Sequence, residues 1–317
     1  MKILITGGAG FIGSNLAHRY AKSKNQIVII DNLCTGKISN IKNILKQKNI
    51  RFYKKDICDK EIIKFIKKNK FDYIYNFACP ASPRYYLKFP IETWEASILG
   101  VRNILKAIKG TNTRLLQAST SEIYGSATEI PQTEKYWGNV NCFGVRACYD
   151  EGKRSAETLI FDYKRLFNID ARIVRIFNTY GQRMDKNDGR VISNFINQAI
   201  NNEDITIYGD GNQTRSFCYI DDTIDAITKI MEKQENIETP INIGNPKEIT
   251  IKELAQLIKD ITGSKSNIKF FEANQDDPPR RKPSINRAIK EIGWTPEIEL
   301  KYGLKKCIEY YVNQINL

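Results

Sequence analysis

The chain has 317 residues, of which 41% are hydrophobic and 27% are charged, and its formal net charge is +13. This length allows one large domain or two modest ones, and the composition is that of an ordinary globular protein. No stretch approaches the roughly twenty consecutive apolar residues that a membrane-spanning helix needs. We therefore expect no membrane partner, and also no signal peptide, because Met1 leads directly into a predicted strand.

The positive charge is spread along the chain and forms no basic arm. Lysines recur throughout, for example at Lys42, Lys54 and Lys67, among many Ile and Asn residues. A general bias toward Lys, Ile and Asn explains the excess of positive charge. We expect these lysines to lie mainly on solvent-exposed faces. Nucleic-acid binding would need clustered basic and aromatic residues, so we expect no nucleic-acid partner.

The seven cysteines form no CxxC pair. The single histidine, His18, cannot complete a zinc site with them. We therefore expect no metal. Scattered thiols of this kind favour a reducing, cytoplasmic location.

The N-terminal segment carries a dinucleotide-binding pattern. A predicted strand over residues 2–6 is followed by Gly7, Gly10 and Gly13, and a helix begins near Phe11. In such a pattern the first glycine forms the tight turn, the second lets the backbone approach a pyrophosphate, and the third lets helix pack on strand. The segment predicts a cofactor whose phosphates lie at the helix N-terminus.

An acidic residue completes this pattern about twenty residues later. Asp31 ends a predicted strand over 26–31, where its carboxylate can bind ribose hydroxyls and would repel a 2′-phosphate, so we expect NAD. Asp56, after a strand over 50–54, is placed to meet the adenine. A strand-end turn residue and a loop aspartate are the respective alternatives. The predicted cofactor-binding residues are Gly7, Gly10, Phe11, Ile12, Gly13, Asp31, Asn32, Thr35, Gly36, Asp56, Ile57, Ala78, Tyr149 and Lys153.

The first half of the chain alternates short apolar runs with helical patterns. This alternation predicts a Rossmann-type α/β fold, a doubly wound parallel sheet. Further strands are expected over 73–77, 114–119 and 171–176. We assign residues 1–177 to an NAD-binding domain, to which the chain returns around 213–243.

The amino-acid composition changes after about residue 177. Asn, Asp and Gly become frequent, which predicts a smaller, loop-rich C-terminal substrate lobe over 178–317. Loops are expected over 178–189, 208–213 and 276–283, and helices over 191–201, 221–234 and 251–261.

Two helical patterns carry more apolar surface than one contact face needs. Their residues recur at spacings of three and four. They are Trp94, Ile98, Val101, Leu105 and Ile108 in the first, and Ala156, Leu159, Ile160, Tyr163, Leu166 and Phe167 in the second. A helix packed on its own sheet is the alternative, but we expect a homodimer through the helices near 93–109 and 149–167.

Tyr149 and Lys153 lie one helical turn apart on the same predicted face. A phenol is a poor base at neutral pH, but a nearby ammonium and a positively charged nicotinamide ring both favour the phenolate. Lys153 can also hold the nicotinamide ribose. The pair follows the dinucleotide pattern and the Ser119–Glu122 cluster, which makes it a strong sign of oxidation and reduction of an alcohol.

Together these features resemble the extended short-chain dehydrogenase/reductase superfamily, whose members act on nucleotide sugars. The run RACYDEGKR at 146–154 is highly specific and is similar to the UDP-glucuronic acid decarboxylase (UDP-xylose synthase) family. The resemblance spans nearly the whole chain. Its other segments are 118–125, 136–141, 175–181, 187–191, 213–217 and 275–278.

The resemblance implies a lyase that recycles NAD. Tyr149 would take the 4-hydroxyl proton of UDP-glucuronate while C4 is oxidised. Carbon dioxide would leave from the resulting 4-keto sugar, and reduction would give UDP-xylose. Thr120 would hydrogen-bond the 4-oxygen, and Glu122, helped by Ser121, would handle a proton. The implied catalytic residues are Thr120, Ser121, Glu122, Tyr149, Lys153 and Arg281, and the implied substrate-binding residues are Asn178, Arg190, Arg215 and Arg281.

Simpler roles remain open for some of these residues. Thr120 and Ser121 also suit a capping cluster, and Arg215 and Arg281 also suit surface charges. Ser121 stands where the related 4,6-dehydratases typically have aspartate. Elimination of water needs an acid at that position, so the serine argues against a dehydratase.

Other positions depart from the decarboxylase pattern and leave the exact sugar and nucleotide base open. Glu92 and Ser97 replace a usual lysine and asparagine, and residues 142–145 alter a loop near the sugar. Residues 281–285 resemble the decarboxylase domain of the bifunctional enzyme of 4-amino-arabinose biosynthesis, which releases the 4-keto-pentose. The alternatives are that release, a nucleotide-sugar 4-epimerase, and a non-enzymatic dinucleotide-sensing protein.

Overall fold

A computed structural model describes residues 1–272 and 280–315. Contacts divide the chain into two units. Unit 1 comprises Met1–Ile123, Asn141–Arg175 and Ile227–Pro240, and unit 2 comprises Tyr124–Val140, Ile176–Ala226 and Ile241–Leu317. The functional domain boundaries expected from the sequence, 1–177 and 178–317, stay a prediction. The segment 275–278, which contributes to the family resemblance, lies outside the described residues.

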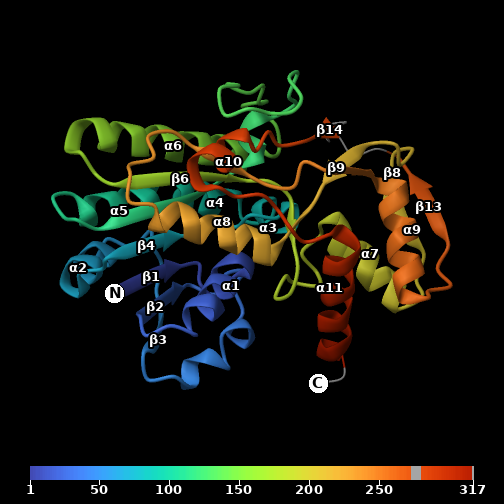
Figure 1. Cartoon of the computed structure of the whole chain (residues 1–317), viewed down its shortest axis with the longest axis horizontal. Coiled ribbons are helices and arrows are strands. Elements are labelled where there is room, and N and C mark those ends of the chain that lie inside the picture. Colours follow the sequence, from blue (N-terminus) through green and yellow to red (C-terminus); the bar gives the residue numbers. More distant parts are fainter. Residues whose placement is uncertain (273–279, 316–317) are drawn as a thin grey trace. The chain divides into compact units, whose positions relative to one another are not determined.

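Short segments rich in apolar residues form the main sheet (Figure 1). Its strands are β1 (Lys2–Thr6), β2 (Gln26–Asp31), β3 (Ile50–Lys54), β4 (Tyr73–Asn76), β5 (Arg114–Thr120), β6 (Ala171–Ile176) and β11 (Ile241–Ile243). Their order is β11-β6-β5-β4-β1-β2-β3, and the pairs β1–β2, β2–β3, β1–β4 and β4–β5 are parallel. This order, in which the chain winds outward in both directions from β1, is that of a Rossmann fold.

Helices connect these strands, and the first of them begins at Phe11, where the glycine pattern predicts a helix start. They are α1 (Phe11–Tyr20), α2 (Glu61–Asn69), α3 (Pro83–Tyr86), α4 (Pro90–Glu95), α5 (Val101–Ile108), α6 (Ala147–Phe167) and α8 (Ile220–Glu232). Short helical turns are η1 (Ile38–Asn40), η2 (Ile44–Lys46), η3 (Ala96–Gly100) and η4 (Ser121–Tyr124). β4 ends one residue before the predicted 73–77, and β5 extends one residue beyond the predicted 114–119.

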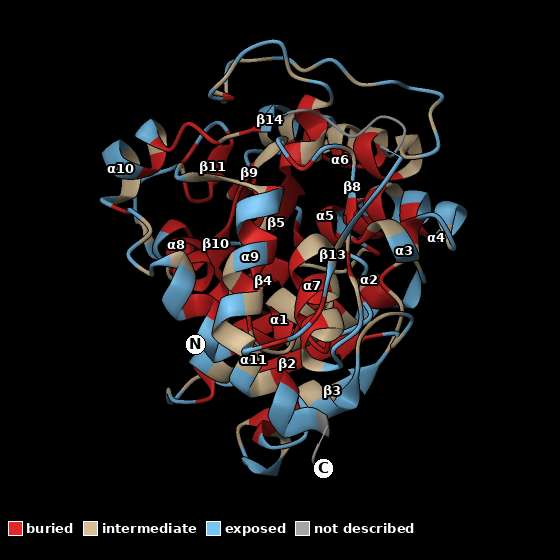
Figure 2. Ribbon diagram, turned by 90° about the vertical axis from the view of Figure 1, so that its right-hand side faces the viewer, coloured by how far each residue is buried: buried red, intermediate tan, exposed pale blue. Residues whose placement is uncertain are grey.

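Helices cover both faces of the unit 1 sheet. One apolar cluster joins Ile66 of α2, Ile104 of α5 and Ile160 of α6 to Ile74 of β4. The next strand residue, Tyr75, points to the opposite face, where its hydroxyl lies 2.5 Å from that of Tyr20 on α1. Figure 2 shows β4 and β5 largely in the red of buried residues. The central strands β4 and β5 are therefore buried on both sides, as is usual for parallel strands covered by helices.

Unit 2 contains further short elements. They are β7 (Thr179–Tyr180), α7 (Val191–Ile200), β8 (Ile205–Tyr208), β9 (Thr214–Ser216), β10 (Cys218–Tyr219), β12 (Glu248–Thr250), α9 (Ile251–Thr262), β13 (Ile268–Phe271), β14 (Arg280–Arg281), α10 (Asn286–Ile292) and α11 (Leu300–Ile315). The strands form the small sheets β10-β7, β12-β9-β14 and β13-β8.

The structure corrects all three of the expected loops in unit 2. Thr179 and Tyr180 form strand β7, Tyr208 ends strand β8, and Arg280 and Arg281 form strand β14. Strands of two to four residues are too short to show the alternation that identifies a strand in a sequence. Their polar composition therefore resembled that of a loop.

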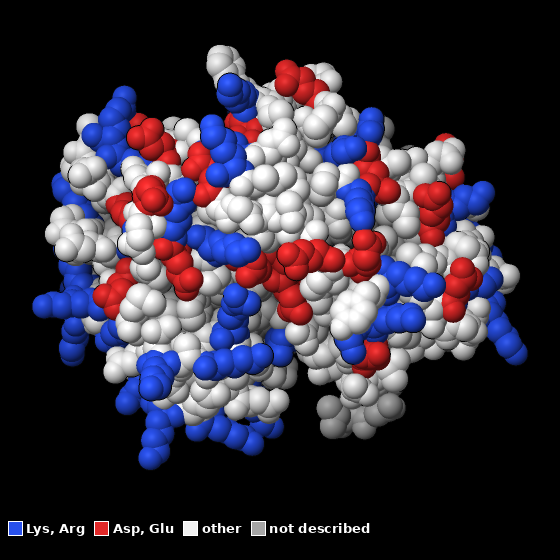
Figure 3. Space-filling model, in the orientation of Figure 1, with Lys and Arg blue, Asp and Glu red and all other residues white. Residues whose placement is uncertain are grey.

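Charge and hydropathy agree with the sequence analysis. Among residues 1–272 and 280–315, every helix is too short or too polar to cross a bilayer. On the face drawn in Figure 3, Lys and Arg side chains are interspersed with Asp and Glu. This arrangement fits a solvated surface.

Candidate active site

The glycine-rich turn after β1 is shaped by backbone crowding. Gly7 has a φ of +66°, and a Cβ there would lie 2.6 Å from the Phe77 carbonyl carbon and 2.7 Å from the Ala78 nitrogen. A Cβ on Gly13, in the first turns of α1, would collide with the Gly7 carbonyl oxygen. Both positions therefore need glycine, and the N-terminus of α1 is left open for an anionic group.

Asp31 connects this turn to the end of β2. Its carboxylate accepts hydrogen bonds from the backbone nitrogens of Ala9 (3.0 Å) and Leu33 (2.8 Å). The side chain is buried, and burial raises the pKa of its carboxyl above the usual value. A Cβ on Gly36 would lie 2.7 Å from a carboxylate oxygen, so the 31–36 segment folds closely around Asp31. Asp31 thus also acts as a strand-end turn residue, which was the alternative role considered for it.

The neighbouring strand end carries the other predicted adenosine contacts. Asn32 donates from Nδ2 to Asp56 Oδ2 at 2.8 Å, which joins the ends of β2 and β3. Asp56 Oδ1 also accepts from the Cys58 nitrogen at 2.8 Å, as a loop aspartate does. Ile57 is buried, and its carbonyl accepts from Asn103 Nδ2 at 3.0 Å.

The remaining predicted cofactor residues of unit 1 fall around the same strand ends. Phe11 and Ile12 open α1, Thr35 lies in the segment after β2, and Ala78 follows β4. The glycine-rich turn at the N-terminus of α1 can bind phosphates through its backbone, and Asp31 lies at the end of the neighbouring strand, β2. This combination fits a dinucleotide.

Tyr149 and Lys153 lie on one face of α6. Both are buried, at 6% and 4% exposure. Lys153 Nζ donates to the Ala118 carbonyl oxygen at 3.0 Å and lies 5.7 Å from the centroid of the Tyr149 ring. The ring of Tyr86 stacks on Tyr149 with centroids 5.1 Å apart. The ammonium and the phenol are therefore held together in a water-poor environment, where their interaction is strong.

Three polar residues, Thr120 to Glu122, follow Ala118, whose carbonyl binds Lys153, at the end of β5 and the start of η4. Thr120 and Ser121 are buried, and Thr120 Oγ1 accepts from the Glu122 nitrogen at 3.2 Å. This bond is the capping arrangement left open for Thr120. The Glu122 carboxylate pairs with the guanidinium of Arg146, the residue before α6, whose Nε also lies 3.9 Å from Asp150 Oδ2. The ion pair therefore places the Glu122 carboxylate next to the residue that precedes α6.

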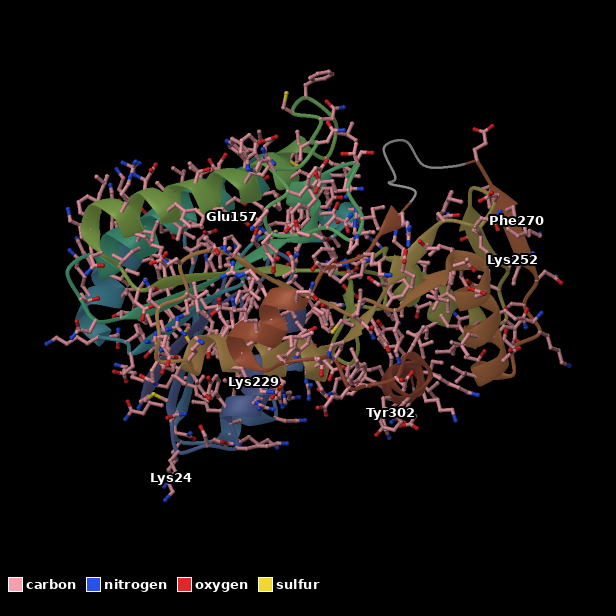
Figure 4. All side chains as sticks on the ribbon, turned by 45° about the horizontal axis from the view of Figure 1, so that its top comes forward. Lys24, Glu157, Lys229, Lys252, Phe270 and Tyr302 are labelled. Atoms are coloured by element: carbon pink, nitrogen blue, oxygen red, sulfur yellow. The ribbon has the colours of Figure 1, made fainter. Side chains whose placement is uncertain are left out.

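The sequence analysis missed a buried ion pair under this site. Glu157, labelled in Figure 4, lies on the side of α6 toward the sheet. Its carboxylate accepts from Arg175 Nε at 3.1 Å and Nη2 at 2.8 Å, and from Ser119 Oγ at 2.5 Å. Because Glu157 is four residues after Lys153 and eight after Tyr149, helical spacing could have revealed it.

Glu157→Gln should lower the free energy of unfolding by about 3–5 kcal/mol, because the Arg175 charge stays buried without its counter-charge. The matched control is Asp162→Asn on the same helix, which removes an exposed ion pair with Arg165. That change should cost below about 1 kcal/mol. Chemical denaturation measures both. Equal losses in the two variants would show that the buried pair contributes nothing special.

Unit 2 brings two of the predicted substrate residues together. Arg215 on β9 and Arg281 on β14 are register partners, and both are buried, at 6% and 7% exposure. Their burial contradicts the surface-charge alternative. Arg190 precedes α7, with Nε 3.1 Å from Asp188 Oδ1, and Asn178 lies between β6 and β7.

The departures from the family pattern lie in different environments. Glu92 is exposed on α4, and Ser97 is buried in η3 with its Oγ 3.4 Å from Cys79 Sγ. Cys142 and Phe143 are exposed, the latter at 90%. Ser97 is thus a packing position, whereas Glu92 and the 142–145 loop meet solvent.

The comparisons with known proteins agree with this geometry. Residues 3–244 match the model of the NAD dependent epimerase/dehydratase family. The chain belongs to this family. The expected Rossmann-type fold and the expected cofactor, NAD, are thereby confirmed.

Curated relatives within this family include UDP-glucuronic acid decarboxylases. UDP-glucuronic acid decarboxylase 6 of Arabidopsis thaliana is 46% identical over 305 residues, which cover 96% of this chain and 87% of the relative. UDP-glucuronic acid decarboxylase 1 of Danio rerio is 44% identical over 314 residues, which cover 99% and 73%. The resemblance identified from the sequence motifs is confirmed.

The chain is also similar to the solved structure of an enzyme with a related activity. UDP-glucuronic acid 4-epimerase from Bacillus cereus, in complex with UDP-glucuronic acid and NAD, is 28% identical with a TM-score of 0.90. The alignment covers 99% of this chain and 100% of that one.

Proposed function

We propose that the chain is an NAD-dependent UDP-glucuronate decarboxylase that forms UDP-xylose through a UDP-4-keto sugar. The observation that carries the proposal is the buried Tyr149–Lys153 pair on α6, with Glu122 bound to Arg146 just before this helix, in a chain that matches UDP-glucuronic acid decarboxylases over 96% or more of its length. A dinucleotide-sensing protein would need the cofactor cradle but not the side chains of Tyr149, Lys153 and Glu122.

Tyr149 is the base in this proposal. Its phenolate oxygen, stabilised by the charge of Lys153, takes the proton of the sugar 4-hydroxyl, and the resulting phenol later returns one. NAD, when bound, supplies a reversible hydride acceptor for C4. Thr120 donates a hydrogen bond to the 4-oxygen. The residues that hold the cofactor are those predicted around Gly7–Gly13, Asp31 and Asp56.

Loss of carbon dioxide follows from the position of the ketone. The 4-ketone is β to the C6 carboxylate, so the bond between C5 and C6 breaks with its electrons entering an enolate, which a preorganised polar site stabilises. Glu122, assisted by Ser121, handles the proton that C5 gains. Arg215 and Arg281 bind the nucleotide diphosphate, because guanidinium groups match phosphate oxygens. Asn178 and Arg190 complete the substrate contacts.

Two finer features belong to the same proposal. Exposed apolar side chains on α4, η3 and α6 support a homodimer through these helices; they include Ile91, Trp94, Leu99 and Leu166, at 66%, 41%, 40% and 64% exposure. All seven cysteines are free thiols, which supports a cytoplasmic location.

Incubation of the purified protein with NAD and UDP-glucuronate tests the activity. We expect carbon dioxide release and a UDP-xylose spectrum by NMR, with no net consumption of NAD. Unchanged UDP-glucuronate would contradict the decarboxylase assignment. Accumulation of the UDP-4-keto-pentose would show that the intermediate is released before reduction.

A nucleotide-sugar 4-epimerase is the second candidate. The likeness to the Bacillus cereus enzyme favours it, because both activities begin with the same oxidation at C4. In the same NMR experiment an epimerase would form UDP-galacturonate and release no carbon dioxide.

A further inference from the structure

Strands β12, β9 and β14 of unit 2 form a small sheet, and their side chains point alternately to its two faces. Strand β9 lies between β12 and β14, with Glu248 opposite Ser216 and Arg280 opposite Thr214. Because successive strand residues point to opposite faces, Arg215 lies on the other face from Thr214. Arg281 likewise alternates with its neighbours, so Arg215 and Arg281 share one face.

The face opposite these two arginines is organised by Glu248. Arg280 donates to both of its carboxylate oxygens, from Nε at 2.7 Å and Nη2 at 2.6 Å. Thr214 Oγ1 donates to Oε1 at 2.8 Å, and Lys282 Nζ lies 3.2 Å from Oε2. One side chain of β12 therefore reaches over β9 to the residues on either side of Arg281.

The surroundings make this a strong set of contacts. The Glu248 side chain is only 14% exposed, and bidentate pairing with arginine is the most directional ion pair available in proteins. The hydrogen bonds from Arg280, Thr214 and Lys282 lower the pKa of Glu248 to about 2, so it is a carboxylate throughout the neutral range.

The backbone on the far side of Arg281 is anchored as well. Gln132 donates its backbone N–H to the Lys282 carbonyl at 2.9 Å, and its Oε1 accepts from the Lys282 nitrogen at 2.9 Å. Ser216 Oγ donates to the Arg281 carbonyl at 3.4 Å. Arg281 thus lies between two fixed neighbours in a strand of only two residues.

Charge explains why such anchoring is needed. Arg215 and Arg281 are like charges on register partners of neighbouring strands, and burial strengthens the repulsion between like charges. The same two groups are complementary to a diphosphate, whose negative charges lie on adjacent phosphoryl groups. Groups that match a ligand in this way bind it best when surrounding contacts fix their positions.

We propose that Glu248 is a positioning residue for the nucleotide diphosphate: by holding Arg280 and Lys282 from the opposite face, it keeps Arg281 in register beside Arg215. This inference rests on the proposed function, because it takes the two arginines to bind UDP-sugar phosphates. Glu248 itself touches no substrate. Its effect is on affinity, because the proton-transfer residues are supplied by other elements.

The test compares UDP binding and kinetics in Glu248→Gln with the unaltered protein. We expect the Kd for UDP by titration calorimetry, and the KM for UDP-glucuronate, to rise about 10- to 100-fold, because small displacements of a binding group are costly. The kcat should stay within about threefold, and NAD content should not change. Glu248→Asp should restore part of the affinity, since its shorter carboxylate keeps the charge.

Two further variants make the result decisive. Glu299→Gln removes the same charge from an exposed pair with Lys247 in unit 2 and should leave the Kd for UDP within about twofold. Arg280→Gln breaks the link from a half-exposed side chain, so it serves if Glu248→Gln fails to fold. It should raise the Kd in the same direction as Glu248→Gln.

The outcomes separate this inference from the function on which it rests. A Kd for UDP that is unchanged in Glu248→Gln and Arg280→Gln overturns the positioning role while leaving the proposed function intact. A fall in kcat and thermal stability without a change in Kd overturns it too, because that is the signature of a merely structural residue. If the unaltered protein does not bind UDP, the proposed function fails and the inference fails with it.

Discussion

Tyr149→Phe should lower the kcat for UDP-glucuronate by about 10²- to 10⁴-fold, the usual contribution of a general base. The substitution removes only the hydroxyl, and the phenyl ring can still stack on Tyr86, whose centroid lies 5.1 Å away. Lys153 keeps its hydrogen bond to the Ala118 carbonyl. The cofactor cradle is therefore preserved, and NAD should remain bound to the variant. Initial rates of carbon dioxide release, with NAD content measured on the same sample, check both expectations.

Tyr163→Phe is the matched control for this variant. Tyr163 lies on the same helix, α6, and packs against Phe167 with ring centroids 5.2 Å apart. Removal of its hydroxyl should leave the turnover rate unchanged. Full activity of Tyr149→Phe would refute the assignment of Tyr149 as the base.

Glu122→Gln should reduce UDP-xylose formation by about 10²- to 10⁴-fold for a different reason. The amide cannot exchange a proton as the carboxylate does, while Tyr149 and Lys153 can still support the oxidation of C4 by NAD. The block therefore falls after oxidation, and NADH should accumulate in a single turnover. Stopped-flow absorbance of NADH, with carbon dioxide release followed in parallel, separates the two steps.

Glu129→Gln provides the same change of charge at an exposed position seven residues along the chain. It should behave like the unaltered protein. If Glu122→Gln and Glu129→Gln form UDP-xylose at the same rate, Glu122 has no role in proton transfer, and its pairing with Arg146 is structural.

Most of the unit 1 fold could be predicted because its signals are local. The apolar runs of β1, β2 and β3 give strands with the predicted bounds, and the glycines after β1 mark a turn that only glycine can form. The spacing of Tyr149 and Lys153 is likewise a property of a single helix. Each of these patterns can be read within a few neighbouring residues.

The remaining site contacts join residues far apart in the chain, which a single sequence does not bring together. Glu122 meets Arg146 after 24 residues, Ser119 meets Glu157 after 38, and Arg280 meets Glu248 after 32. No propensity or period encodes such pairs. The burial of Arg281 could not be predicted for the same reason. Its strand, β14, has only two residues and depends on pairing with β9 rather than on its own sequence.

The position of Asp31 has a consequence for how this family can change its cofactor. The carboxylate expected to choose between the two nicotinamide dinucleotides also accepts hydrogen bonds from Ala9 and Leu33, and it fills the space beside Gly36. Selectivity and the folding of the phosphate-binding turn are thus properties of one side chain. A lineage that evolves toward NADP cannot simply exchange this residue. Such a change also needs another acceptor for those two backbone donors, because Asp31 is the group that binds them.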